Sequence, residues 1–486
     1  MKRFILYYIA FLPLLFSSCN DWLTVQPEAS IGVEELLNSE EGFFEAINGI
    51  YTKGADNYFY GGLFTVEIQD ALIQNYSFKV QDYTQYVRTS MFDFTDVTFK
   101  WRNSLIWNNA YNGIANANLI LENIDGKKEI FHEGMYELVK GEALALRAYF
   151  HFDLLRYFAL PYSSGASSKS IPYVTAYSNR VTPLSTVQEV IDKALSDLNE
   201  AKRLLATCDP ILKAGYIVGY NNYEEDSQST EEEGTLFLQN RRHRLNYFAV
   251  CGTLARVYLY AGNRTEALAN AKEVIDANKF PWVDRDRFLA EEKTRDRLIY
   301  PELLFAWYIE KQEENMRNRY ENTTTGYFIN NDHVKNIYEV ATVGADDDRF
   351  KSWFSLSTEG NYQIIKYLRN DQKTGNIHYL ASPSIRLSEM YYIAAESVYE
   401  TNPGMAWNYL NTVRTHRGIG TPLDSSDNFQ DELLKEYRKE TYAEGQAFYA
   451  YKRLNKSIRS ESGIIFQPTN IAPIPLPDDE TEFGNR

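Results

Sequence analysis

The residue spacings that most often carry catalysis are missing from this sequence. It contains no GxxxxGK[ST] run for binding phosphate and no GxSxG turn for a nucleophilic serine. The segment HEGMYE, which begins at His132, lacks the second histidine that a zinc-binding HExxH helix requires. His151 stands among aromatic residues in YFHFD, and we interpret it as a packed side chain. These features predict no phosphate-binding loop, no zinc helix and no serine nucleophile, and we expect no metal or cofactor.

Carboxylates leave one catalytic alternative open. The acidic runs EED, EEE and DDD, the last at residues 346–348, are interpreted as solvated loop segments rather than as ligands for calcium. Glycoside hydrolysis needs only two placed carboxylates, and the chain has 66 acidic residues from which a pair could come. A secreted hydrolase therefore stays as an alternative function.

One cysteine is placed for covalent modification. Two cations and an uncharged run, residues 4–16, lead through two serines to Cys19. The run has the length of a signal-peptide core and is shorter than the roughly 20 residues that span a bilayer. The pattern is typical of a bacterial lipobox, so we predict a signal peptide over residues 1–18 and a Cys19 thiol carrying acyl chains such as palmitate. An ordinary secretory signal with a chance cysteine is the alternative.

Composition limits the classes of partner. The 486-residue chain has a net charge of −16, which argues against binding nucleic acid. Only Cys208 and Cys251 accompany Cys19, too few for a disulfide framework, and Cys251 is predicted in the core. Aromatic residues make up 15% of the chain, with 37 tyrosines, and tyrosine serves both in cores and on binding surfaces.

Helical spacing of apolar residues dominates the chain. Ser39 is a candidate N-cap for a helix through EEGFFEAINGIYTKG, whereas residues 55–103 are predicted to be a long loop. A helix is expected from Leu105, and the next one should stop before Pro161. Another helix is expected after an N-cap at Ser185. The sequence therefore predicts a fold that is dominated by α-helices.

Two segments share one helix–turn–helix layout. When SIRLSEMYYIAAESVYETNPGMAWNYLNTVRTHRG is laid over RLNYFAVCGTLARVYLYAGNRTEALANAKEVID, Ala394 falls on Ala255 and Ala406 on Ala267. Small residues at such positions let paired helices approach closely, as in tetratricopeptide repeats. We predict tetratricopeptide-like hairpins that stack into a scaffold beside a loop-rich layer. The degenerate members are expected at 105–158 and 185–205, and the loop layer at 206–241 and 280–384.

Several segments, spread over both halves of the chain, carry a resemblance to one known family. In the N-terminal half they are LLFSSCNDW, WNNAYNGIANANLILENID and GEALALRAYFHFDLLRYFALPY. In the C-terminal half they are SPSIRLSEMYYIAAES, LNTVRTHRG, LLKEYRKETYAEGQAFYAYKRLN and IAPIPLPDDE. With these segments the whole chain resembles the SusD/RagB family of outer-membrane lipoproteins of Bacteroidetes. One departure is Gln446, which stands where the family commonly has arginine and so puts one structural ion pair in question.

The resemblance implies a binding protein rather than an enzyme. It implies a lipid-anchored protein on the cell surface of the outer membrane, which captures a glycan and delivers it to a SusC-like, TonB-dependent transporter. Four tetratricopeptide units would face that barrel. A peptide-capturing lid of the same family is the alternative. The mature chain, residues 19–486, is expected to form a single domain with halves at 19–240 and 241–486.

The resemblance also places the ligand site on loops, and the chain has two aromatic loop regions, 55–103 and 280–370. Sugar rings stack on flat aromatic side chains, and amides and guanidinium groups bind their hydroxyls. Trp307, within the apolar run LLFAWYI, is predicted to be core. The expected ligand-binding residues are Trp101 and Trp353 as stacking platforms, Asn103 and Arg88 as hydroxyl-binding groups, and Tyr83 and Tyr327 at the flanks.

Overall fold

The computed structural model describes residues 32, 35–78, 82, 84–220, 228–290, 295–321, 327–369 and 378–484. Helices dominate these residues, and the described strands form three two-stranded sheets, so the prediction of an α-dominated fold is confirmed. Within the described ranges, no helix combines the length and the apolar character that crossing a membrane requires. Cys19 and Tyr83 lie outside the described residues.

The N-terminal half is built on long helices. The ends of these helices follow from local chemistry. Ser39 caps the first, as predicted, because its Oγ accepts a hydrogen bond from the Gly42 amide at 3.1 Å. The cap of the helix expected at Ser185 is Thr186 instead, which forms a capping box with Glu189. The elements are α3 (Glu40–Gly54), η3 (Leu63–Glu67), α4 (Ile68–Leu72), α5 (Val87–Ser90), α6 (Val97–Ile124), η4 (Asp125–Ile130), α7 (Met135–Phe158), α8 (Tyr162–Gly165), α9 (Val187–Leu205), η5 (Pro210–Leu212), η6 (Leu236–Leu238) and η7 (Arg241–His243).

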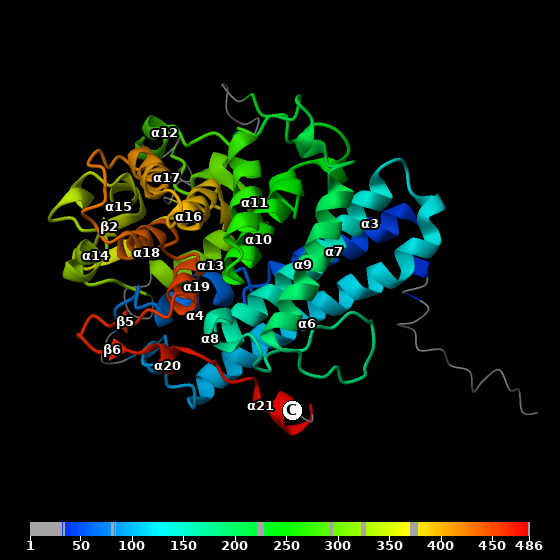
Figure 1. Ribbon diagram of the computed structural model, residues 1–486, viewed down its shortest axis with the longest axis horizontal. Coiled ribbons are helices and arrows are strands. Elements are labelled where there is room, and N and C mark those ends of the chain that lie inside the picture. The colour runs from blue at the N-terminus through cyan, green and yellow to red at the C-terminus, as the bar shows by residue number, and fades with distance from the viewer. Residues whose placement is uncertain are drawn as a thin grey trace, which may run out of the picture.

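The two predicted repeats are helical hairpins that pack on each other. They are α10 (Tyr247–Tyr260) with α11 (Arg264–Asp276), and α16 (Leu387–Val398) with α17 (Pro403–His416). The four aligned alanines of these hairpins are all fully buried. Helix α11 packs against α16, although a long insertion separates them in sequence. Together with α6, α7 and α9, the hairpins form one continuous stack of helices, each packed on the next (Figure 1).

The insertion between α11 and α16 is more regular than the sequence suggests. Its longest sheet pairs β1 antiparallel with β4, with Trp307 opposite Ser382. Figure 1 places α12, α14, α15 and β2 together at the left, beside the helical stack. The elements are α12 (Arg285–Leu289), η8 (Tyr300–Glu302), β1 (Leu303–Tyr308), α13 (Gln312–Tyr320), α14 (Asn331–Ile337), η9 (Val343–Ala345), α15 (Asp348–Trp353), β2 (Phe354–Leu356), β3 (Tyr362–Ile364) and β4 (Ala381–Arg386).

Buried ion pairs join this insertion to the C-terminal helices. Arg349 pairs with Glu436 at 2.8 Å and with Glu440 at 2.9 Å. Arg417 pairs with the same Glu440 at 2.7 Å and with Glu302 at 2.6 Å. All five side chains are fully buried, and we call them the arginine–glutamate network. The C-terminal elements are α18 (Phe429–Glu440), α19 (Gln446–Arg453), β5 (Ile458–Arg459), β6 (Ile465–Phe466), α20 (Pro468–Ile471) and α21 (Asp478–Glu482).

Two sequence expectations about loops are wrong. Residues 55–103 hold η3, α4 and α5, and α6 already begins at Val97 because Asp96 caps it. The run at 346–348 is not wholly solvated, since Asp347 and Asp348 are buried and pair with Arg349 and Arg285. Across the described ranges, no group of three His, Cys, Asp or Glu residues is arranged to hold a metal.

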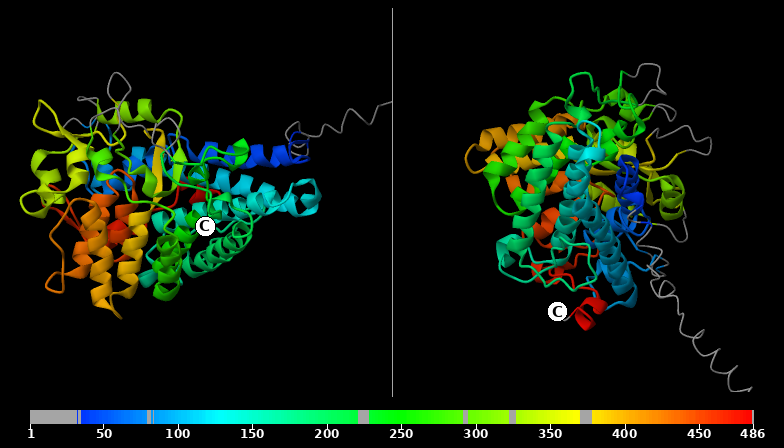
Figure 2. Two further views of the ribbon diagram at one scale, coloured as in Figure 1. Left: turned by 90° about the horizontal axis from the view of Figure 1, so that it is seen from above. Right: turned by 90° about the vertical axis from the view of Figure 1, so that its right-hand side faces the viewer.

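Helices α3 and α6 project together from one side of the molecule. Viewed from above in Figure 2, α3 and α6 extend side by side past the other helices. The C-terminal end of α3 turns back toward β1, where Gly54 lies against the Trp307 ring. This turn brings the segment after α3 beside the insertion, where the candidate site lies.

Candidate functional site

Two exposed aromatic rings stand together at the start of α6. Trp101 lies in the second turn of that helix and is 52% exposed, and Tyr58 is 49% exposed. Their ring centroids are 5.9 Å apart, with the planes at 75°. Soluble proteins cover most such rings, so an exposed aromatic pair is a candidate contact surface. The predicted exposure of Trp101 is confirmed, although the residue lies within a helix rather than before it.

Chain neighbours of both rings reach a polar cleft of about 240 Å³, since Arg102 donates to the carbonyl of Thr84, one of its lining residues. Asn57, directly before Tyr58 in the chain, is one of its lining residues. Helix α13 contributes amide and guanidinium groups from the other side. The lining residues are Asn57, Glu67, Thr84, Asn315, Asn318, Arg319 and Tyr327. We call the exposed pair and these residues the aromatic cleft.

Glu67 and Arg319 form the charged floor of the aromatic cleft. The Arg319 Nε donates to a Glu67 oxygen at 2.7 Å, and the Tyr86 hydroxyl donates to the other oxygen. Burial opposes the charge on Glu67, yet the Arg319 guanidinium and the Tyr86 hydroxyl together hold the pKa of Glu67 below its usual value. The carboxylate is therefore ionised and neutralised within the protein, which leaves the cleft suited to an uncharged polar ligand.

Tyr327 is held rigidly at the edge of the cleft. Its ring stacks on Tyr76 with centroids 4.7 Å apart, and its hydroxyl donates to Glu67 at 3.3 Å. Tyr76 is itself fixed by a 3.0 Å hydrogen bond between its hydroxyl and that of Tyr320. Tyr327 is therefore beside the cleft, as its predicted flanking role requires, but most of its ring is buried.

The structure does not bring all of the predicted ligand-binding residues to this surface. Trp353 is only 1% exposed, and its indole N–H donates to the Arg297 carbonyl at 2.6 Å, so the prediction that it is an accessible platform is wrong. Asn103 is buried and donates to the Pro475 carbonyl at 2.8 Å, so it faces the protein and not a ligand. Arg88 is exposed and pairs with Asp93 at 2.8 Å. Tyr83 and Cys19 lie outside the described residues.

The sequence reasoning missed the polar half of the cleft. Asn315, Asn318 and Arg319 come from α13, whose sequence QEENMRNRY looks like any solvated helix. Their position in the sequence could have identified them. Helix α13 lies between a buried strand and Tyr327, inside the aromatic region 280–370 in which the ligand site was expected.

A larger groove, of about 700 Å³, lies beside β1. The end of α3, the segment around η6 and η7, and the turn before β4 enclose it. Tyr308, at the end of β1, is 52% exposed at this groove. The lining residues are Asn48, Tyr51, Thr52, Glu232, Leu236, Gln239, Asn240, His243, Arg244, Tyr300, Trp307, Tyr308, His378, Leu380 and Ala381, and we call this space the β1 groove.

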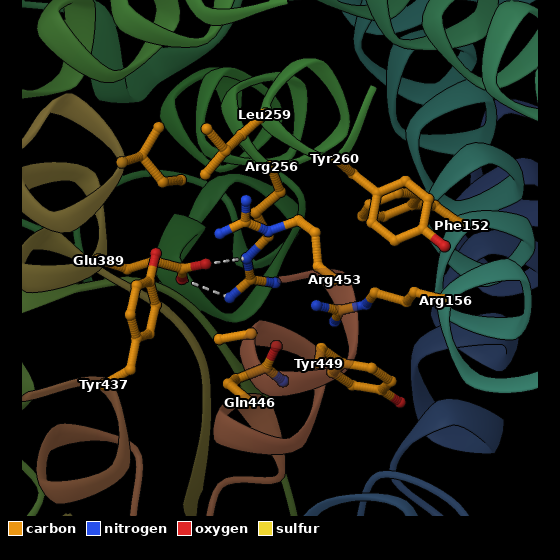
Figure 3. Close-up of a pocket in the computed structure, with 12 residues that line it drawn as sticks. Phe152, Arg156, Arg256, Leu259, Tyr260, Glu389, Tyr437, Gln446, Tyr449 and Arg453 are labelled. Atoms are coloured by element: carbon orange, nitrogen blue, oxygen red, sulfur yellow. Dashed lines mark hydrogen bonds and ion pairs between the residues drawn. The ribbon is translucent and has the colours of Figure 1, made fainter. Parts of the chain in front are cut away.

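A third space, about 40 Å³, lies among α7, α10, α16 and α19. Figure 3 shows the guanidinium groups of Arg156, Arg256 and Arg453 around it, with Arg256 bonded to Glu389. Gln446 lies beside them, so an arginine at position 446 would add a further positive charge to a crowded cluster. The space admits water-sized molecules but no sugar ring, and we assign it to the scaffold.

Most of the chain matches known protein families. Residues 214–472 match the SusD family, and residues 21–210 match a family described as starch-binding and associating with the outer membrane. A SusD-like protein of Formosa agariphila, P38, is 24% identical over 520 residues, covering 94% of this chain and 93% of the relative.

Solved structures share the fold. A SusD superfamily protein of Bacteroides thetaiotaomicron aligns with a TM-score of 0.68 and 21% identity, covering 92% of this chain and 98% of that one. A putative sugar-binding protein of Bacteroides vulgatus aligns with a TM-score of 0.67 and 24% identity, covering 90% and 91%. The stacked helices and the inserted layer therefore occur together in these proteins.

Proposed function

Because the chain belongs to the SusD family, we propose that it is a non-enzymatic surface protein that binds a glycan at the aromatic cleft. The family match over residues 21–210 carries the description starch-binding, and one structural relative is called a putative sugar-binding protein. Both descriptions support a saccharide ahead of a peptide as the ligand class.

The observation that carries the proposal is the exposed pair of rings beside a polar cleft. One face of a sugar ring is lined with C–H groups and packs on an aromatic face, whereas its rim carries hydroxyls. Tyr58 and Trp101 supply the aromatic surface. Asn57, Asn315 and Asn318 supply amides that both donate and accept hydrogen bonds, which suits hydroxyl groups.

The proposal includes the membrane and a partner. Cys19 would be the first residue of the mature protein and would carry the lipid anchor at the outer surface of the outer membrane. A SusC-like, TonB-dependent transporter would be the partner that receives the glycan, with the helical stack facing it. The support for these roles is the signal-like sequence before Cys19 and the family described as associating with the outer membrane.

Calorimetry with purified oligosaccharides tests the binding site. The panel is maltohexaose, cellohexaose, xylohexaose and mannohexaose, and the variants are Tyr58→Ala and Trp101→Ala. Loss of either ring should weaken binding by about 1–3 kcal/mol, as expected for an aromatic hot spot. Tyr177→Ala is the matched control, because Tyr177 is 50% exposed and lines neither the aromatic cleft nor the β1 groove.

Three experimental results would contradict parts of this proposal. Unchanged affinity in folded Tyr58→Ala and Trp101→Ala proteins would remove the aromatic cleft from the proposal. Binding of extended peptides but of no oligosaccharide would favour the peptide-capturing alternative. Turnover of an oligosaccharide by the pure protein would favour the hydrolase.

A further inference from the structure

We propose that the β1 groove is a second saccharide-binding site, distinct from the aromatic cleft. The first reason is a set of buried polar atoms that have no hydrogen-bond partner. Several such atoms occur in the described part of the chain, and three of them belong to residues of this groove: the Trp307 Nε1, the His378 Nε2 and an Arg244 Nη. All three residues line the same groove. A buried polar group without a partner is costly, so we take three of them around one space as support for a ligand that supplies the missing hydrogen bonds.

The neighbouring contacts hold these three groups in fixed positions. The Trp307 ring stacks on Tyr60 with centroids 4.7 Å apart, at 9° between the planes. The His378 ring lies flat on Tyr300 at 3.7 Å, at 4°. A preorganised set of hydrogen-bonding groups loses little conformational entropy when a ligand binds.

Arg244 is held in the same way, and its contacts leave one nitrogen for a ligand. Its Nε donates to Glu142 at 2.9 Å, and one Nη donates to Asn48 at 2.7 Å. The second Nη is the buried nitrogen that has no partner. Arg244 therefore acts in the groove as a fixed N–H donor.

The charge of the groove favours a neutral ligand. Arg244 is paired with Glu142, and Glu232 adds a negative charge to the lining. Burial, with Arg242 and His243 nearby, lowers the pKa of His378 well below its usual value, so its imidazole is uncharged. The lining therefore offers no surplus positive charge that would select an anion.

The apolar and polar parts of the lining suit a sugar. Tyr308 offers a half-exposed ring at the end of β1, and its ring contacts His243 edge-on at 5.6 Å. Gln239, Asn240 and Thr52 add amide and hydroxyl groups to the lining. A volume of about 700 Å³ falls in the usual range for a ligand pocket. Aromatic surface, neutral charge and several donors are the features that recognise an oligosaccharide.

The choice of a saccharide rests on the proposed function, but the groove itself rests on the geometry above. The test therefore separates the two sites. Calorimetry uses the same four neutral hexasaccharides, with hexagalacturonate as an anionic probe. In a Tyr58→Ala/Trp101→Ala double variant, which disables the aromatic cleft, a weaker binding event for a neutral oligosaccharide should persist. Adding Tyr308→Ala or His378→Phe should then raise its dissociation constant about tenfold or more, whereas adding Tyr177→Ala should leave it unchanged.

His378→Phe keeps an aromatic ring on Tyr300 but removes the Nε2, and Tyr308→Ala changes a half-exposed side chain, so one of the two remains informative if the other unfolds. Loss of all binding in the double variant, or unchanged affinity in the folded groove variants, would overturn the second site while leaving the first. Binding that depends on Tyr308 but not on Trp101 would instead overturn the aromatic cleft and keep the groove. Preference for hexagalacturonate, or no binding of any oligosaccharide by the wild type, would refute a neutral saccharide ligand.

Discussion

Trp101 and Trp353 have similar local sequences but opposite environments. Each lies within two residues of a lysine and has a further polar neighbour, in FKWRN and FKSWF. Trp101 projects from the free side of α6, whereas Trp353 ends α15 and is covered by Lys366, whose Nζ lies 3.9 Å from the ring centroid. Polar neighbours therefore indicate that a segment approaches the surface, but they do not show which way a given side chain points.

At the same scale, the arginine–glutamate network predicts that one substitution will strongly lower the stability of the protein. Glu440→Gln removes a negative charge that two buried arginines share, and the uncompensated charge should lower the free energy of unfolding by about 3–5 kcal/mol. Chemical denaturation at pH 7 measures this loss. Glu200→Gln is the control, because its pair with Arg203 is exposed to solvent, and it should change stability by about 0.5 kcal/mol or less. Equal effects of the two variants would contradict the assigned role of the network.

The same network determines the direction in which the stability of the protein changes with pH. Although burial opposes their charge, the paired arginines and, for Glu436, Lys439 hold the pKa values of Glu436 and Glu440 far below the usual value. A carboxylate with a depressed folded-state pKa contributes full stability above its unfolded pKa of about 4.3 and loses it as pH falls below that value. The stability gap between wild type and Glu440→Gln should therefore be constant from pH 7 to 5 and narrow toward pH 3.

At the scale of elements, the helical hairpins depend on small residues at their contacts. Ala255 and Ala267 in the first hairpin and Ala394 and Ala406 in the second are all buried where helices approach. Stacking α11 on α16 also brings together two helices that the inserted layer separates in sequence. The insertion can therefore carry ligand-binding groups without interrupting the helical stack.

A pair of substitutions in α11 tests this close packing. Ala267 is fully buried, whereas Ala269 in the same helix is exposed. Ala267→Leu should lower the free energy of unfolding by about 1–3 kcal/mol, because the added atoms have no space between the helices. Ala269→Leu should be nearly neutral. Thermal melts of both proteins make the comparison, and a melting temperature that is unchanged by Ala267→Leu would show that the hairpin is loosely packed there.

At the scale of the whole molecule, the prediction concerns attachment to the membrane. Mass spectrometry of the mature protein from its native membrane should find Cys19 as the first residue, carrying acyl chains. Cys19→Ala should abolish that modification, whereas Cys208→Ala should retain it. Several acyl chains anchor a protein stably, since each buried CH₂ adds about 0.8 kcal/mol. An unmodified mature N-terminus at another residue would refute the lipid anchor.

Extraction of the wild-type protein in mild detergent tests the proposed partner in the same preparation. A large outer-membrane β-barrel should co-purify with it. Recovery of the lipidated protein alone in several mild detergents would contradict a stable complex with a transporter, while leaving the anchor intact.

The sequence by itself determined the local structure and the family. The Ser39 cap, the helix end before Pro161 and the two aligned hairpins follow from short-range patterns, and each is confirmed in the structure. The core positions of Trp307 and Cys251 also follow, because each lies in a continuous apolar run. Such features depend on residues within a few turns of one another, so the sequence contains them directly.

Only the tertiary structure decided where the two proposed binding surfaces lie. The aromatic cleft joins Asn57, Glu67, Arg319 and Tyr327, which come from segments more than two hundred residues apart. The β1 groove likewise depends on the three unpartnered nitrogens meeting around one space. Exposure, charge pairing and a missing hydrogen-bond partner are properties of how distant segments pack. No local pattern specifies them, which is why the similar sequences around Trp101 and Trp353 led to the same expectation although only Trp101 is exposed.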